Sequence, residues 1–269
     1  VLDAIRESGR PVVGHNASFD LAYSLAQFAA HPLPRAWAEY KALVRASLPG
    51  GLYDTKHLAA QLSAAHGLGL GDTSLGGLYG KLMDEGWLRA SVSGVALATG
   101  VGRGRGGGGG GGVPEVLHAP GHGGYAGLAD PGAKAHEAGF DAFMTGAVFA
   151  RLLRIAEVKA ARGGLAGEDH APQLVPAPGT APDGGGAAAA GPSSEAAAAA
   201  ERDALLQPVL PYCGRVHVNR SDLPYYDLYG AADPVVSRPA VLHVAGFTPG
   251  TRPYYLLQRF QAAGLGPLQ

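Results

Sequence analysis

Residues 11–20 read Pro11-Val12-Val13-Gly14-His15-Asn16-Ala17-Ser18-Phe19-Asp20, and this stretch decides the fold. A short apolar run that ends in a glycine and polar residues is typical of a buried strand followed by a turn. Apolar side chains then recur at Leu21, Leu25 and Phe28, which predicts a helix with one face against a sheet. The pattern indicates an α/β fold, in which ligands bind beside the C-terminal ends of strands. Asp20 is therefore a candidate site residue, although a simple helix cap explains it equally well.

A second stretch, His136-Glu137-Ala138-Gly139-Phe140-Asp141-Ala142, opens a helix that the apolar spacing predicts over residues 137–158. It places an imidazole and a carboxylate five positions apart, His136 and Asp141 (141 minus 136). Together with Asp20, these side chains are what a metal-dependent phosphodiester hydrolase needs. Carboxylates hold divalent ions, and an imidazole takes the proton from water. The alternative is that His136 and Asp141 only form local hydrogen bonds at the start of a helix.

The composition excludes few function classes. The 269 residues carry a net charge of −1, so no overall basic field indicates a nucleic-acid binder, although a local groove can still be basic. The single cysteine, Cys213, excludes an internal disulfide. No apolar run approaches the length of a membrane span, and the first residues do not form a signal peptide. We therefore expect no membrane partner.

Two stretches of biased composition divide the chain. The first contains seven consecutive glycines at 106–112, and the second is rich in Ala, Gly, Pro and Ser. Neither can bury enough apolar area to order itself, so both are predicted to be flexible. The expected order begins with a folded core over 1–160 that contains a flexible insertion at 91–124, followed by a disordered linker over 161–204. A connecting segment over 205–238 leads to the start of another domain over 239–269, with a strand at 240–247 and a helix at 254–260.

Several residues near the predicted strand ends have two interpretations. Asp54 is expected to cap the helix that follows it. Lys56 is either a solvated surface charge or a contact to an RNA phosphate. Asn16 either orients the turn, which we favour, or contacts the substrate. His15 is expected to pack or to bond to backbone rather than to bind metal.

The order of the motifs adds a family resemblance. The chain resembles the poly(A)-specific ribonucleases, which are deadenylases of the DEDD class of 3′ exonucleases with a catalytic histidine. A lone histidine and aspartate at this spacing would not be specific, but five ordered motifs are. The C-terminal part resembles that family's passage into its RNA-recognition-motif domain. The motifs are Pro11–Asn16 with Phe19-Asp20, Tyr53–Lys56, Thr73–Leu75, His136–Ala142, and Arg220–Tyr225 with Val241–Val244.

The resemblance implies an α/β, RNase H-like nuclease core with a mixed sheet flanked by helices. In that family four acidic residues bind two Mg²⁺ ions. Asp20 matches the second acidic motif, Asp141 matches the third, and His136 matches the general base. The implied reaction removes poly(A) tails from the 3′ end and releases 5′-AMP. Lys56 and Asn16 are then candidate RNA contacts. A homodimer in the nucleus and cytoplasm is expected by the same analogy.

The chain departs from the family pattern at its start. The first motif, an Asp-x-Glu, and a small domain that binds single-stranded nucleic acid would lie upstream of Val1. We therefore expect a fragment truncated at both ends that is inactive by itself. One alternative is an RNA-binding or assembly protein of the same fold without catalysis. Another is a DNA-directed proofreading exonuclease, against which the RNA-recognition-motif resemblance argues.

Overall fold

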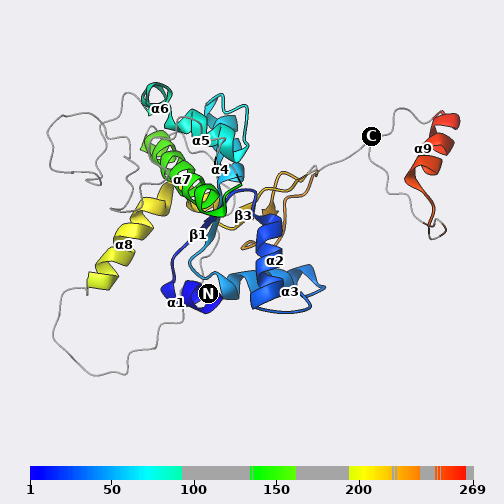
Figure 1. Ribbon diagram of the computed structural model, residues 1–269, viewed down its shortest axis with the longest axis horizontal. Coiled ribbons are helices and arrows are strands. Elements are labelled where there is room, and N and C mark those ends of the chain that lie inside the picture. The colour runs from blue at the N-terminus through cyan, green and yellow to red at the C-terminus, as the bar shows by residue number, and fades with distance from the viewer. Residues whose placement is uncertain are drawn as a thin grey trace. The chain divides into compact units, whose positions relative to one another are not determined.

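The computed structural model describes residues 1–92, 134, 136–161, 194–219, 221, 223–236, 246, 248 and 250–264. Contacts between residues divide the chain into two compact units, Val1–Val235 and Val236–Gln269. All the predicted catalytic residues belong to the first unit, and Figure 1 labels its helices and some of its short strands.

The first elements form where their apolar patterns predict them. Helix α1 spans Leu2–Ser8 and ends at Gly9, whose φ of 56° is the left-handed conformation common at helix C-termini. Strand β1 covers Val12–Gly14, and helix α2 covers Ser18–Phe28. The predicted corner between strand and helix is confirmed, with Asp20 in the first turn of α2.

A second corner between a strand and a helix lies beside the first. Helix α3 (Trp37–Ser47) leads to strand β2 (Leu52–Asp54), which pairs with β1 in parallel. Helix α4 (Thr55–His66) follows at once. The Asp54 side chain accepts two backbone N–H groups of the first turn of α4, so the predicted cap is confirmed. Because the strands are parallel, both corners lie at the same edge of this sheet.

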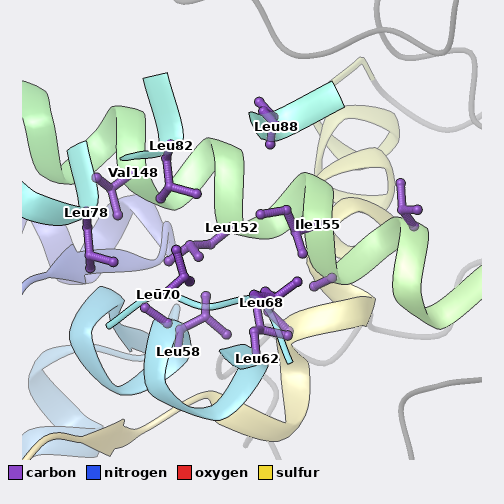
Figure 2. Close-up of a cluster of buried hydrophobic side chains, with 14 of the residues drawn as sticks. Leu58, Leu62, Leu68, Leu70, Leu78, Leu82, Leu88, Val148, Leu152 and Ile155 are labelled. Atoms are coloured by element: carbon purple, nitrogen blue, oxygen red, sulfur yellow. The ribbon is translucent and has the colours of Figure 1, made fainter. Parts of the chain in front are cut away.

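The larger hydrophobic core surrounds helix α7 (Ala138–Ala161), which packs on α4 and on α5 (Leu75–Met83). Helix α6 (Glu85–Val92) also contacts α7 and begins just before the stretch predicted as flexible. Each fully buried leucine here stabilises the unit by roughly 1.5–3 kcal/mol. Figure 2 shows the side chains that fill this core, among them Leu58, Leu62, Leu68, Leu70, Leu78, Leu82, Leu88, Val148, Leu152 and Ile155.

The segment after residue 193 differs from the expectation of a linker and a connecting segment. Helix α8 covers Ser194–Leu206, so the end of the predicted linker is helical. The 3-10 helix η3 (Gln207–Tyr212) and strands β3 (Arg215–Val216) and β4 (Tyr226–Asp227) follow. Their apolar side chains are buried in the first unit, so this segment is part of the core. The buried residues are Val209, Cys213, Val216, Val218 and Leu228.

The described sheets are smaller than the single mixed sheet that we predicted. β1 and β2 form a parallel pair, and β3 and β4 form an antiparallel pair. A hydrogen bond from Gly214 N–H to the Leu52 carbonyl, 2.7 Å long, joins the second pair to β2. Both strand directions are therefore present, but the strands are only two or three residues long. Helices make up most of the described unit.

The second unit contains helix α9 (Pro253–Ala262), which confirms the helix predicted at 254–260. Most of the strand predicted at 240–247 lies outside the described residues, as do most of the 91–124 insertion and residues 162–193 of the linker. The RNA-recognition-motif domain stays a prediction. Among the helices that the structure describes, none is long and apolar enough to cross a membrane.

Candidate functional site

A buried carboxylate organises the edge of the parallel sheet where both corners lie. Asp54 is 1% exposed and accepts backbone N–H groups from three separate segments. Those of Asn16 (2.9 Å) and Ala17 (3.2 Å) come from the turn after β1, and that of Lys56 (2.9 Å) comes from α4. The His57 N–H, also of α4, lies 3.5 Å away, and the fifth donor, His217 (3.0 Å), is the residue after β3. We call these residues the Asp54 junction. It fixes the turn from which α2, and with it Asp20, begins.

The Thr55 hydroxyl adds a second link between the corners. It donates to the Gly14 carbonyl at 3.1 Å and lies 3.0 Å from His15 Nδ1. Because its only hydrogen is given to the carbonyl, the hydroxyl must accept from Nδ1–H of His15. The imidazole therefore carries its proton on Nδ1 and leaves Nε2 as an acceptor when it is neutral. His15 bonds to a side chain here, whereas we had expected packing or a backbone partner.

Three basic side chains gather around the Asp54 junction. Burial lowers the pKa of His15, and the nearby Lys56 ammonium and His217 lower it further while Asp54 opposes them. Burial also lowers the pKa of His217, with Lys56 acting in the same direction. The charge of Lys56 thus influences the protonation of both His15 and His217. Lys56, a predicted RNA contact, therefore lies in a polar and partly buried setting rather than on an open surface.

The start of α7 carries the other predicted catalytic pair. The backbone N–H of His136 donates to Asp141 Oδ1 at 3.3 Å, so the two residues meet. His136 has a φ of 69°, and Asn16 has a φ of 56°. Among the described residues these are the only two other than glycine with positive φ. Such backbone strain concentrates at functional sites, and both residues were candidates from the sequence alone.

The metal ligands expected from the sequence come from two helices that pack near one strand. α2 follows β1 directly, and α7 contacts β1. Asp20 is exposed in the first turn of α2, and Asp141 is partly exposed in the first turn of α7. Within the described ranges, no group of three or more His, Cys, Asp or Glu side chains is arranged to hold a metal ion. The roles of Asp20, His136 and Asp141 in metal binding and catalysis thus stay predictions.

A comparison with known families agrees with these motifs. A model of the family described as CAF1 family ribonuclease matches residues 1–149, which is more than half of the chain. The chain belongs to the CAF1 ribonuclease family. The match includes Asp20, Asn16, Lys56, His136 and Asp141. No curated protein and no solved structure matches the chain.

Membership of the CAF1 ribonuclease family supports a nuclease with a DEDD-type, deadenylase-like domain. It implies an RNase H-like α/β fold, an RNA substrate and the use of divalent metal ions. The donor chemistry of this chain fits such ions, because Asp20 and Asp141 offer the hard carboxylate oxygens that Mg²⁺ prefers. Each carboxylate has several lone pairs, so the bond from His136 to Asp141 leaves room for a metal.

The sequence did not reveal two features of this CAF1 ribonuclease. One is His217, which joins the Asp54 junction although it is 163 positions from Asp54 in the chain. The other is a pocket beside the start of α2, lined in part by Phe19 and Trp37. Phe19 stands next to Asp20 in the sequence, but Tyr23 and Phe28 of the same helix are equally exposed, so no sequence signal singles out Phe19.

Proposed function

We propose that this chain carries part of the catalytic core of a Mg²⁺-dependent 3′-to-5′ exoribonuclease that shortens poly(A) tails and releases 5′-AMP. The match of residues 1–149 to the CAF1 ribonuclease family is the observation that carries this proposal. The ordered motifs around Asp20, Asp54 and Asp141 support the finer assignment to poly(A).

In the proposed reaction, water attacks the phosphorus of the terminal phosphodiester. The bond from phosphorus to the 3′ oxygen of the preceding nucleotide breaks, and the last nucleotide leaves with its 5′ phosphate. Asp20 and Asp141 would hold the metal ions. When bound, two such ions lower the pKa of water and stabilise the charge on the leaving oxygen. His136, exposed at the start of α7, would accept the proton that the attacking water loses.

Lys56 and Asn16 would contact the RNA at the C-terminal edge of the parallel sheet. The Lys56 ammonium is close enough to His15 and His217 to lower the pKa of both, so it is a positively charged donor for phosphate oxygens at this edge. The left-handed turn at Asn16 lies between β1 and the helix that carries Asp20. An RNA strand that follows this edge would pass beside the predicted metal ligands.

The test uses the protein as its gene encodes it. RNAs with a 3′ run of adenosines or of uridines are incubated with Mg²⁺ or with EDTA, and nucleotide products are separated by chromatography. We expect 5′-AMP from the adenylated RNA with Mg²⁺ only. Asp141→Asn should lower its release by roughly 10²- to 10⁴-fold, whereas Glu137→Gln should not, because Glu137 is an exposed neighbour that pairs with Lys134.

Equal release of nucleotides from Asp141→Asn and from the unaltered protein would refute the role of Asp141. Release of 5′-UMP at the same rate as 5′-AMP would refute poly(A) specificity. RNA that is bound but never shortened by the unaltered protein would favour the alternative, an RNA-binding protein of the same fold without catalysis.

A further inference from the structure

A pocket of about 390 Å³ lies where α2, α3 and the β3–β4 pair meet. This volume falls within the range of about 300–1,000 Å³ that small-ligand sites occupy. One wall is the first turn of α2, which contributes Phe19 and Ser18. Asp20 follows Phe19 directly in the same turn of α2, although its own side chain does not line the pocket.

Another part of the lining is a set of aromatic rings that contact one another. Trp37 stacks on Tyr40 with centroids 5.2 Å apart and meets Tyr226 at 5.0 Å and an angle of 59°. The indole N–H of Trp37 also donates to Asp233 Oδ2 at 2.5 Å. Because these contacts fix the ring, a ligand that packs against it would not have to order it first.

Two of the rings are nevertheless open to solvent. Phe19 is 63% exposed and Trp37 is 40% exposed. The exposed residues Arg35 and Asn219 add a guanidinium and an amide to the same lining. Flat rings with a few hydrogen-bonding groups are what proteins use to hold unpaired bases, which stack on aromatics and present polar edges. An aliphatic side chain of a protein partner would leave these polar groups without a role.

We propose that this pocket binds a base of the single-stranded RNA substrate, close to the end that is hydrolysed. The proposal rests on the proposed function for the nature of the strand. Phe19 and Trp37 pack against the base, Asn219 bonds to its edge, and Arg35 contacts the neighbouring phosphate. The pocket thereby positions the strand relative to the turn that carries Asp20.

Trp37 itself can report on the base. The chain has two tryptophans, so a Trp87→Phe background leaves Trp37 as the single tryptophan. Oligoadenylate is titrated in EDTA, which prevents hydrolysis, and fluorescence is recorded. We expect saturable quenching, and Phe19→Ser should weaken binding about tenfold, as expected for losing one aromatic partner of a base. The matched control is Tyr23→Ser, which removes an equally exposed ring (67%) one turn along α2 and should leave the affinity unchanged.

A kinetic assay separates the pocket from the chemistry. In the protein as its gene encodes it, Phe19→Ser should raise KM about tenfold and leave kcat and the Mg²⁺ dependence unaltered. Quenching of Trp37 without any shortening of RNA would support the pocket and reject the proposed nuclease function. Either of two results would overturn the proposed role of the pocket: no quenching at saturating oligoadenylate, or an equal loss of affinity in Phe19→Ser and Tyr23→Ser. A fluorescence change that follows protein concentration without RNA would also overturn it, because it would indicate a second copy of the chain as the occupant.

Discussion

Asp54 and Asp141 both stand at the start of a helix, yet their surroundings differ. Asp54 is 1% exposed, and its carboxylate accepts N–H groups from the turn after β1, from α4 and from the residue after β3. Asp141 is partly exposed and accepts one N–H from His136, which is five positions away. The first carboxylate holds distant segments together, whereas the second has lone pairs left for a ligand.

The difference shows how one residue type at one kind of position can serve structure or chemistry. An aspartate whose acceptors are saturated by backbone donors cannot also bind a metal without unfolding its surroundings. An aspartate with spare acceptors at an exposed helix start can. Partners and exposure, rather than position along a helix, distinguish the two roles.

The sharpest test of this contrast removes the saturated carboxylate. Asp54→Ala leaves several buried N–H donors without acceptors, and each costs about 1–3 kcal/mol. We expect a loss of at least about 4 kcal/mol in the free energy of unfolding, which is a large part of the total stability of a domain. Urea denaturation followed by circular dichroism measures it. Asp84→Ala is the matched control, because Asp84 caps only α6 through the Trp87 N–H and should cost about 1 kcal/mol.

The same contrast predicts the opposite outcome for the exposed carboxylates. Asp20→Asn and Asp141→Asn should each change the free energy of unfolding by less than about 1 kcal/mol. Each should lower the rate of adenylate release by roughly 10²- to 10⁴-fold, because a metal site contributes several kcal/mol to the transition state. Rates and urea midpoints are measured on the same preparations. A variant that is both inactive and strongly destabilised would show that its aspartate has a structural role like that of Asp54.

A pH titration probes the buried side of the Asp54 junction. Burial lowers the pKa of His57 to about 4, with Arg215 and His217 acting in the same direction and Asp54 opposing them. The unfolded chain, with a histidine pKa near 6.5, binds a proton that the folded chain does not bind between about pH 6.5 and pH 4. The contribution of His57 to the free energy of unfolding is therefore fully present above pH 6.5, and it falls by roughly 3 kcal/mol as the pH drops to 4.

Replacing this ring tests whether His57 is the cause. His57→Phe keeps a ring against Tyr225, which it meets edge-on at 4.8 Å, and removes the titration. Urea midpoints from pH 7 to pH 4.5 should then fall less steeply than in the unaltered chain. Identical slopes would show that other groups, such as His15 or His217, cause the acid sensitivity.

The smallest expected effect concerns the link between the two corners. Thr55→Val removes the hydroxyl that bonds the Gly14 carbonyl and His15, and should cost about 1–2 kcal/mol. NMR of the imidazole nitrogens should show His15 with its proton on Nδ1 in the unaltered chain and a mixture of both tautomers in the variant. A mixture in both proteins would contradict the assigned hydrogen bond.

Much of the local structure could be predicted from the sequence, because it depends on patterns within a few residues. The helical spacing gave α2 and α7 closely, and Asp54 was recognised as a cap. Residues 215–218 alternate as a strand does, and β3 covers Arg215–Val216, but the place of 209–228 in the core was missed because its burial depends on partners far away in the chain. The left-handed backbone at Asn16 and His136 was not predicted, although Asn and His are among the non-glycine residues that adopt it most often.

In the candidate site, too, the sequence predicted the features that depend on nearby residues and missed those that depend on distant ones. Asp20, His136 and Asp141 could be proposed because their motifs are contiguous and ordered. The contact between Asp54 and the segment after β3 could not be predicted. Its donor is the backbone N–H of His217, and because nearly every residue has a backbone N–H, this group does not distinguish one position from another. The aromatic pocket was missed because its rings come from α2, α3 and β4, which no single sequence window contains.

The hydrogen bond from His217 to Asp54 also has a practical consequence for anyone who clones this protein. The family match ends at residue 149, and α7 ends at Ala161, so either position looks like a natural place to cut a gene. A product stopped there would lack the strand β3 and the buried Val209, and would expose hydrophobic surface during synthesis. We therefore expect gene fragments that extend past Val235 to give soluble protein and the shorter fragments to give inclusion bodies.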